Sequence, residues 1–517
     1  MTALFEPYRN EPNSRFDDAG VLASYREAVA GVRQSFGARY PLLLGGERVE
    51  TGGWLASLNP CNTGEVVGNT AAGRREHVEQ AIDAAWNAFA VWSRLPMEHR
   101  ARTLVKLAAI MRRRKRELAA WEILEAGKNY AEAEAHVNEA IDFVEYYARQ
   151  AMSLAEPLPT HDYPGEENTS FLMPIGVGVV IPPWNFPLAI LTGMTVGPVV
   201  AGNTVVTKPS PSTPIIAQQF MACVQEAGFP PGVINLLTGE DSDIGDPLVD
   251  HPRVRFINFT GSLATGTRIN ERAAKVHEGQ RWLKKVFVEM GGKDALLVDE
   301  TADLELAAQA AVVSAFGYQG QKCSAMSRLI VVDSVYDELV ERLVASTGRL
   351  SFGPSEENHD VGALINEKQY QKVLDYIEIG KSEAKLALGG ERGPESGYYV
   401  TPTIFAEVPE TARIAREEIF GPVVAVIRAR DFEDGLRIVN DTAYALTGGV
   451  ISQDRARLER ARREFHVGNL YFNRKITGSL VGIQPFGGFN LSGNNAKAGG
   501  PDYVRLFMEM KTVTERF

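Results

Sequence analysis

Between residues 176 and 289, short apolar runs alternate with longer amphipathic segments, and this alternation limits the possible folds more than any other feature. The pattern predicts strands at 177–181, 203–207, 233–237, 254–259 and 286–289. It predicts helices at 188–200, 214–227, 242–249 and 262–275. Short strands separated by helices of ~10–15 residues form βαβ units and a parallel sheet. Such a sheet binds ligands at the carboxyl ends of its strands.

The rest of the chain divides around this segment. Residues 1–73 are mixed and turn-rich, and two helices are predicted at 78–92 and 99–120. A second α/β stretch follows residue 290, with helices near 303–315, 334–347, 365–380 and 453–465 and strands near 423–427 and 468–472. At ~150 residues per domain, 517 residues suggest about three domains. No repeat or low-complexity linker separates the stretches, so we expect the domains to pack tightly.

Charge and cysteine content exclude several classes of protein. Lys+Arg minus Asp+Glu is 54 − 65 = −11, which argues against general affinity for nucleic acid or an anionic membrane. We therefore interpret the basic run at 112–116 as a solvated helix face. Three cysteines rule out a disulfide framework and indicate a reducing, cytoplasmic setting. The histidines are scattered, so no metal site is predicted.

One long segment requires a test as a membrane span. No charged residue occurs between Asn168 and Thr207. Pro182, Pro183 and Pro187 interrupt the segment, and a continuous helix is therefore excluded. We predict two buried elements joined by an apolar turn. The amino terminus carries early charges and no apolar h-region, so we expect no signal peptide.

Three side chains could carry chemistry. Cys323 lies in the Gly-rich polar run 320–324, which favours a reactive thiol, although a lone cysteine is more often a small hydrophobic residue. Glu289 ends an apolar strand before Gly291 and Gly292; it suits a general base or a satisfied strand-end carboxylate equally well. Asn185, in an apolar turn, could stabilise an oxyanion or simply cap that turn.

The sequence also contains elements of a dinucleotide site. The G-x-G-x-x-G fingerprint is absent. Gly261 and Ser262 instead stand at a strand-to-helix junction, where a helix amino terminus can hold a pyrophosphate. Lys208 ends another strand and places a cation near the same edge. Together these residues predict a dinucleotide site at the strand ends.

Six motifs in chain order resemble the aldehyde dehydrogenase superfamily over nearly the whole chain: 183–187, 208–210, 259–262, 289–293, 320–323 and 418–422. The resemblance implies an α/β fold with a Rossmann-like dinucleotide-binding domain at 1–155 and 171–289. It implies a second α/β catalytic domain at 290–482. It also implies a small β oligomerisation flap at 156–170 and 500–517, whose apolar tail we expect to pair with another subunit.

Residues 465–488, together with Arg9-Asn10-Glu11-Pro12, are similar to one branch of that superfamily. Its members oxidise L-glutamate γ-semialdehyde, formed from 1-pyrroline-5-carboxylate, to L-glutamate with NAD(P) in the second step of proline catabolism. The alternatives are a dehydrogenase for another aldehyde, a thiol hydrolase without a redox cofactor, and a non-catalytic paralogue.

The resemblance also implies a role for each site residue. Cys323 attacks the aldehyde, Asn185 and the Cys323 amide hold the oxyanion, and Glu289 activates water. The implied cofactor-binding residues are Pro183, Trp184, Lys208, Ser210, Gly261, Ser262, Glu418 and Phe420. The implied substrate-binding residues are Ser324, Gly478, Ser479, Phe186, Phe486 and Lys322.

Two positions depart from the family pattern. Pro211 occupies a position where many relatives have a glutamate that favours NAD, so NADP remains an alternative cofactor. Ser479 replaces a common alanine, which we expect to be harmless. The resemblance further implies a homo-oligomer, either a dimer or a dimer-based hexamer. Proline dehydrogenase is the implied functional partner, and we expect a monofunctional enzyme because a fused proline dehydrogenase does not fit in this length.

Overall fold

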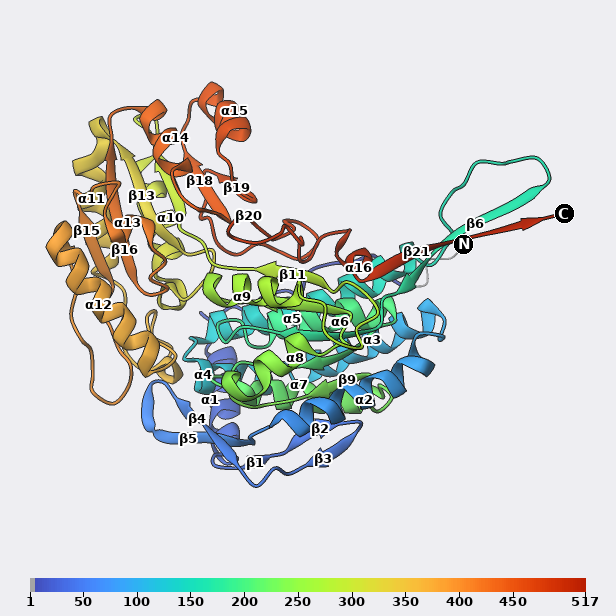
Figure 1. Ribbon diagram of the computed structural model, residues 1–517. Helices are drawn as coiled ribbons and strands as arrows, with labels where there is room; N and C mark the ends of the chain where they lie inside the picture. The colour runs from blue at the N-terminus through green and yellow to red at the C-terminus, as the bar shows by residue number, and fades with distance from the viewer. Residues whose placement is uncertain (1–4) are drawn as a thin grey trace.

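The computed structural model describes residues 5–517 (Figure 1). The first of its two large sheets has the strand order β11-β10-β7-β8-β9-β2-β3. Five strands are parallel: β7 (Val177–Ile181), β8 (Thr204–Thr207), β9 (Ile234–Leu236), β10 (Phe256–Thr260) and β11 (Lys285–Glu289). All five lie within two residues of their predicted bounds. The antiparallel strands β2 (Leu42–Leu44) and β3 (Glu47–Val49) extend one edge.

The order of these strands fixes the position of a ligand crevice. The chain builds β7, β8 and β9 in one direction across the sheet and then returns to add β10 and β11 beside β7. The order therefore reverses between β7 and β10, and open parallel sheets bind ligands at such a switch point. The segments that leave these two strands are 182–187 and 261–262, which contain predicted site residues.

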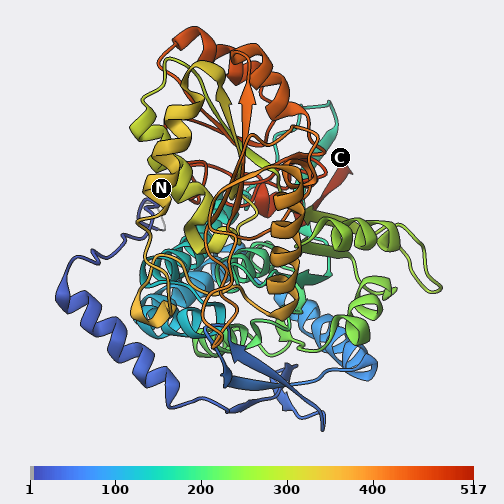
Figure 2. The same ribbon diagram turned by 90° about the vertical axis from the view of Figure 1, so that its left-hand side faces the viewer.

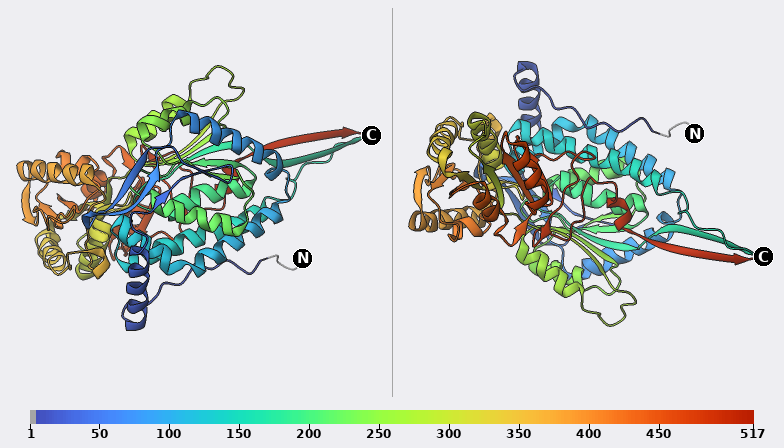
Figure 3. Two further views of the ribbon diagram at one scale, coloured as in Figure 1. Left: turned by 90° about the horizontal axis from the view of Figure 1, so that it is seen from below. Right: turned by 90° about the horizontal axis from the view of Figure 1, so that it is seen from above.

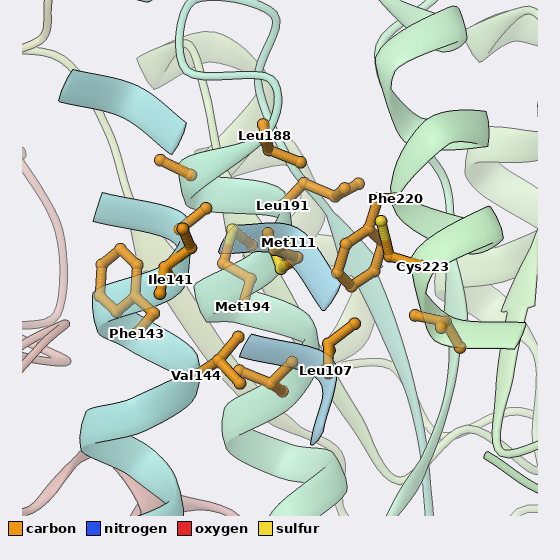
Figure 4. Close-up of a cluster of buried hydrophobic side chains, with 14 of the residues drawn as sticks. Leu107, Met111, Ile141, Phe143, Val144, Leu188, Leu191, Met194, Phe220 and Cys223 are labelled. Atoms are coloured by element: carbon orange, nitrogen blue, oxygen red, sulfur yellow. The ribbon is translucent and has the colours of Figure 1, made fainter. Parts of the chain in front are cut away.

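Helices cover both faces of the first sheet, and side chains alternate between two apolar cores. Val177 and Val179 face the core under α2 (Arg75–Trp92) and α9 (Leu263–Ala273), whereas Val180 faces the other core. The second core is formed by α3 (Met97–Arg113), α5 (Tyr130–Ser153), α6 (Ala189–Ala201) and α7 (Pro214–Ala227), as Figure 4 shows. The charge-free segment is thus divided among strands and α6. No helix of residues 5–517 is long and apolar enough to cross a membrane.

Three predictions in this half were incomplete or wrong. The predicted helix 99–120 is interrupted at Arg114 (φ −92°, ψ 12°), where the Arg114 guanidinium turns to Glu117 and the Cys223 sulfur, and α4 (Lys115–Ala126) follows. In place of the predicted helix 242–249, the structure has a short π-helix at Asp241–Gly245 followed by α8 (Asp246–Asp250). The turn-rich start contains helix α1 (Ala19–Arg33) and a sheet of β1 (Arg39–Tyr40), β4 (Trp54–Asn59) and β5 (Asn62–Ala71).

The second large sheet has the strand order β14-β15-β16-β13-β12-β18-β19 and is parallel except for β14. Its strands are β12 (Asp294–Val298), β13 (Met326–Val332), β14 (Lys385–Leu388), β15 (Thr403–Ala406), β16 (Val423–Ala429), β18 (Thr447–Ile451) and β19 (Asn469–Phe472). Its helices include α10 (Leu304–Phe316), α11 (Asp333–Thr347), α12 (Glu367–Glu383), α14 (Phe432–Asn440) and α15 (Arg455–Glu464). Figure 2 shows these elements stacked above the first half of the chain.

A very short link joins the two sheets. Glu289 is the last residue of β11 and Asp294 is the first residue of β12, so only residues 290–293 lie between them. The carboxyl edge of the first sheet is therefore tied directly to the amino edge of the second. Cys323 precedes β13, which pairs with β12 at that amino edge.

A two-stranded ribbon projects from the body (Figures 1 and 3). It pairs β6 (Glu166–Pro174) with β21 (Met508–Arg516) in an antiparallel ladder. The ladder extends past residue 170, the boundary expected from the sequence, and continues through Pro174, opposite the buried Met508. The tail docks through α16 (Tyr503–Leu506), but Met510, Val513 and Phe517 are exposed.

Close packing within the first sheet gives a test of the fold. A Cβ added at Gly178 on β7 would lie 2.0 Å from the ring of Phe256 on β10. Gly178→Ala should therefore lower the free energy of unfolding by about 1–3 kcal/mol, as overpacking does. Gly31→Ala on α1, with nothing within 4 Å of the new methyl group, should raise it by about 0.5–1 kcal/mol. Chemical denaturation of both variants checks this; equal effects would contradict the packing described.

Candidate active site

A cavity of about 390 Å³ lies where the edges of the two sheets meet. Its lining comes from the strand ends, from α5 and from the loop after β19. Eight residues singled out in the sequence line it: Phe186, Glu289, Lys322, Cys323, Ser324, Gly478, Ser479 and Phe486. The structure therefore brings together, in one enclosed space, residues that are up to 300 positions apart in the sequence.

The turn that presents Cys323 has unusual backbone geometry. Tyr318, Gln319 and Gly320 all have positive φ (51°, 54° and 65°), a conformation that non-glycine residues rarely adopt. The buried Tyr318 hydroxyl donates to the carbonyl of Ala126 at 2.9 Å and holds this turn against α4. The Cys323 thiol is only partly buried. Its backbone N–H donates to no acceptor among residues 5–517, so it is available to an oxyanion.

Asn185 reaches the same turn from the end of β7. Its side-chain amide donates to the Gln321 carbonyl at 3.0 Å, which uses one of its two hydrogens. Its amide nitrogen has no second acceptor among residues 5–517. Asn185 is 3% exposed and is not among the residues that line the cavity, so the role as an oxyanion donor stays a prediction.

A buried charge network supports Asn185 and Phe186 from behind. The Lys128 ammonium donates to the Asn185 carbonyl and lies 3.4 Å from the Glu122 carboxylate. His136 is 3.1 Å from that carboxylate, and its ring stacks on Phe186 at 4.1 Å. Burial lowers the pKa of Lys128 to about 8 and that of His136 to about 4. The network fixes one wall of the cavity.

The environment of Glu289 suits a general base. Burial raises the pKa of Glu289 to about 8, although Lys497 opposes the shift. The backbone on either side is fixed, since Gly261 donates to the Glu289 carbonyl at 3.1 Å and Met290 donates to the Ser492 carbonyl at 2.8 Å. A carboxyl that titrates near physiological pH can both accept and return a proton.

The thiol itself is held in its protonated form. Burial, with the neighbouring carboxylates Glu289, Asp294 and Glu418, raises the pKa of Cys323 well above its ordinary value. A thiol in this state needs a base before it can act as a nucleophile. Glu289 lines the same cavity, and of these three carboxylates it has the largest electrostatic effect on the Cys323 thiol.

The double glycine of the link is required by close contacts. A Cβ at Gly291 would lie 2.0 Å from a Glu418 carboxylate oxygen, and one at Gly292 would lie 2.7 Å from the Cys323 carbonyl. The Gly292 N–H donates to Glu418 at 3.1 Å. These two glycines therefore let Glu418 and the nucleophile's turn approach the carboxyl edge of the first sheet.

The predicted cofactor residues follow this edge outside the cavity. Ser262 caps α9 by accepting from the Thr265 N–H at 3.3 Å, and the N–H groups of Leu263 and Ala264 have no acceptor among residues 5–517. Free donors at a helix amino terminus suit a phosphate. The ammonium of Lys208, which is 2% exposed, stands at the end of β8.

The remaining cofactor candidates lie on both sides of the interface between the sheets. The Trp184 ring meets the Phe420 ring edge-on at 5.3 Å, and Phe420 has a positive φ of 62° that Gln369 stabilises by donating to its carbonyl at 2.8 Å. Pro183 precedes Trp184, and the Ser210 hydroxyl accepts from the Ser212 N–H at 3.3 Å. Donors, a cation and aromatic rings along one edge fit a dinucleotide.

Hydrogen-bond donors and positive charge also belong to the lining of the cavity. The amide N–H groups of Gly478 and Ser479 have no acceptor within residues 5–517. Lys322 lines the cavity, 3.8 Å from Glu132. Lys475 lines it too and was missed from the sequence; burial and the nearby Lys322 lower its pKa. These N–H groups and the two ammonium groups suit an anion.

The sequence analysis also did not identify two acidic residues that line the cavity. Glu139 and Asp142 on α5 line the cavity. Burial raises the pKa of Glu139 to about 8 and that of Asp142 to about 6. The sequence offered only a weak signal for these two residues, because α5 is buried on most sides and such a helix shows little hydrophobic periodicity. No cluster of His, Cys, Asp or Glu that could hold a metal occurs in the described part of the chain.

Comparison with known proteins decides the family. The family model described as "Aldehyde dehydrogenase family" matches residues 49–513. The chain belongs to the aldehyde dehydrogenase family. It is 53% identical over 515 residues to 1-pyrroline-5-carboxylate dehydrogenase of Geobacillus kaustophilus, covering 99% of this chain and 100% of that protein. Identity to the Bacillus subtilis protein of the same name is 51% over 511 residues, with 99% of each covered.

Solved structures of this aldehyde dehydrogenase's relatives match equally well. A structure of 1-pyrroline-5-carboxylate dehydrogenase from Thermus with bound NAD has a TM-score of 0.99 and 56% identity, covering 99% of this chain and 100% of that one. Proline utilization A (PutA) from Bdellovibrio bacteriovorus has a TM-score of 0.97 and 43% identity. There the match covers 99% of this chain but 53% of that one.

The raised pKa of Glu289 predicts a pH profile for this aldehyde dehydrogenase. Below about pH 8 the carboxyl carries a proton and cannot act as a base, so turnover should rise as pH increases through about 8. Propanal suits this measurement better than glutamate γ-semialdehyde, because propanal cannot cyclise. In Glu289→Gln, turnover should fall and this rise should disappear. Persistence of the wild-type profile in the variant would exclude Glu289 as the base.

Proposed function

We propose that this aldehyde dehydrogenase oxidises L-glutamate γ-semialdehyde, formed from 1-pyrroline-5-carboxylate, to L-glutamate with NAD. The observation that carries the proposal is the polarity of the cavity. The Cys323 thiol shares the cavity with two unpaired backbone N–H groups and with the ammonium groups of Lys322 and Lys475. A substrate with an aldehyde at one end and a carboxylate at the other matches both. Relatives at 51–53% identity carry the name of this activity.

The first step forms a bond between sulfur and carbon. The Cys323 thiol loses its proton to solvent, and the sulfur adds to the aldehyde carbon to give a thiohemiacetal. As the sulfur–carbon bond forms, the former carbonyl oxygen gains negative charge. The free hydrogen of the Asn185 amide and the Cys323 N–H stabilise that charge, as oxyanion donors do.

Oxidation and hydrolysis follow at the same carbon. NAD, when bound along the strand edge, supplies the acceptor for the hydride that leaves this carbon, and a thioester remains on Cys323. Glu289 then takes a proton from a water molecule, whose oxygen attacks the thioester. The carbon–sulfur bond breaks, the acid leaves, and the sulfur regains a proton.

The walls of the cavity suit the rest of the substrate. Phe186 and Phe486 provide apolar surface for its methylene groups. Ser324 adds a hydroxyl beside the nucleophile, and the Gly478 and Ser479 amides reach the α-carboxylate. Glu139 offers a carboxyl oxygen that can accept a hydrogen bond from the α-ammonium. An uncharged aldehyde would leave the donors unpaired, which is costly in a site built for hydrogen bonds.

The negative charge beside Lys208 supports a preference for NAD over NADP. Pro211 supplies no carboxylate, but the Asp241 carboxylate pairs with the Lys208 ammonium at this edge. A negative charge at this position disfavours the 2′-phosphate of NADP and supports NAD. A thiol hydrolase would have no use for this edge, so the arrangement argues against that alternative.

We also propose the setting in which the enzyme works. The exposed apolar residues of the β6–β21 ribbon support pairing with a second copy, in a dimer or a dimer-based hexamer. A proline dehydrogenase would supply the substrate, and the low cysteine content supports a cytoplasmic location.

Initial rates of NADH formation at 340 nm test the function directly. We expect kcat/KM for 1-pyrroline-5-carboxylate to exceed that for propanal, and rates with NAD to exceed those with NADP. Equal kcat/KM for the two substrates would contradict the assigned substrate. Product formation without any dinucleotide would favour the hydrolase.

Substitution at the carboxylate end should change specificity. Ser324→Ala removes a donor, and the expected loss is about 1–3 kcal/mol for a hydrogen bond to a charged group, roughly 5- to 150-fold in kcat/KM. The loss should fall on glutamate semialdehyde, whereas kcat/KM for propanal should change much less. Equal losses for both aldehydes would mean that Ser324 supports the nucleophile and not the substrate.

Truncation of the ribbon should change assembly. Removing residues 509–517 deletes nearly all of β21 but keeps the buried Phe507 and Met508. We expect a lower molecular mass by light scattering, with the Tm of the remaining fold little changed. A full-length protein that is already monomeric, or a truncated one with unchanged mass, would refute the proposed pairing.

A further inference from the structure

The amino-terminal arm, residues 5–16, lies against the proposed carboxylate end of the cavity. Glu11 and Asn13 line the cavity itself. The arm has no helix or strand, and Figure 3 shows it lying along the layer of helices before it reaches α1. Neither the proposed mechanism nor the proposed substrate contacts require it.

Asn10 connects this arm to two other parts of the wall. Its amide nitrogen lies 2.9 Å from the Asp142 carboxylate on α5 and 3.0 Å from the carbonyl of Val481. The Tyr8 hydroxyl donates to the same Val481 carbonyl at 3.2 Å and accepts from Asn10 at 2.8 Å. Val481 follows the Gly478–Ser479 turn by two residues. Asn10 thus ties the substrate loop to α5.

The loop between Gly478 and Gly482 is also held by other contacts. Leu480 donates to the Gln484 side chain at 2.8 Å, the Gly482 N–H donates to the Gly499 carbonyl at 2.9 Å, and the Val481 side chain is buried in the core. Gly478 and Gly482 both have positive φ (75° and 76°), a conformation that glycine adopts readily. At the Val481 carbonyl, the side-chain donors among residues 5–517 come from Tyr8 and Asn10.

The arm is well anchored on α5 and α3. The Glu11 N–H donates to the second oxygen of Asp142 at 2.8 Å, so the arm satisfies both oxygens of this buried carboxylate. The Glu11 side chain pairs with Arg112 at 2.6 Å. Ser14 donates twice to Glu134 at 2.9 Å, farther from the loop. Asn10 therefore holds the Val481 carbonyl in a fixed position relative to α5.

We propose that Asn10 is a positioning residue that holds the Gly478 and Ser479 amides in place for the substrate's carboxylate. The arm is then part of the specificity of the enzyme and not only of its stability. This inference rests on the proposed function. It places the effect of Asn10 on binding of the anionic end, because Asn10 donates to Tyr8, Asp142 and Val481 and not to Cys323 or Glu289.

Two variants of Asn10 and one matched control test the proposal. Asn10→Ala deletes the donors, and Asn10→Asp keeps the size but replaces donors with acceptors facing Asp142 and the Val481 carbonyl. Both should raise KM for glutamate semialdehyde, by about tenfold for Asn10→Ala, with kcat little changed. Propanal kcat/KM should stay within about twofold of wild type. Ser14→Ala removes an arm contact without touching the loop, and it should leave both substrates unchanged.

A binding measurement adds a readout independent of turnover. Calorimetric titration of L-glutamate, the product, into Asn10→Ala should show the same weakening as KM, whereas the Ser14→Ala protein should bind like wild type. The proposal is overturned if Asn10→Ala keeps the wild-type KM and glutamate affinity, if propanal loses activity in proportion, or if Ser14→Ala shows the same split. A wild-type enzyme without preference for glutamate semialdehyde over propanal would instead refute the proposed function.

Discussion

The four-residue link between Glu289 and Asp294 is the constraint on which the rest of the site depends. It joins the carboxyl edge of one parallel sheet to the amino edge of another, so the two edges must face each other. The first edge offers N–H groups at the amino terminus of α9 and a cation for a dinucleotide, and the second offers a thiol on a strained turn. The glycines of the link permit this closeness, since side chains at Gly291 and Gly292 would collide with Glu418 and with the nucleophile's turn.

Burial then sets the chemistry at this junction. The same desolvation raises the pKa values of Cys323 and Glu289 and lowers that of Lys128. A thiol with a raised pKa reacts only after it loses its proton, and a carboxyl that titrates near pH 8 can take a proton from water. The buried Lys128 ammonium, paired with Glu122, keeps Asn185 and Phe186 in place without entering the cavity.

The sequence predicted the first sheet well because its strands are continuous apolar runs bounded by clear turns. Local context singled out Cys323, Glu289 and Asn185 but left a structural alternative for each, and the resemblance to the family supplied their predicted roles. It missed the break at Arg114, since no glycine or proline marks a bend that tertiary contacts of one guanidinium produce. It also missed Glu139, Asp142 and the part played by Asn10. Their positions depend on how α5, the arm and the last loop pack together, which no local pattern encodes.

The central claim is that the two sheet edges act in turn on one carbon, which Cys323 holds until Glu289 activates water. The most direct test is peptide mass spectrometry of Glu289→Gln after brief exposure to glutamate semialdehyde and NAD. The account predicts an acyl adduct on the peptide that contains Cys323, formed together with one equivalent of NADH. An adduct on Cys61 or Cys223, or NADH formed without any adduct, would contradict it.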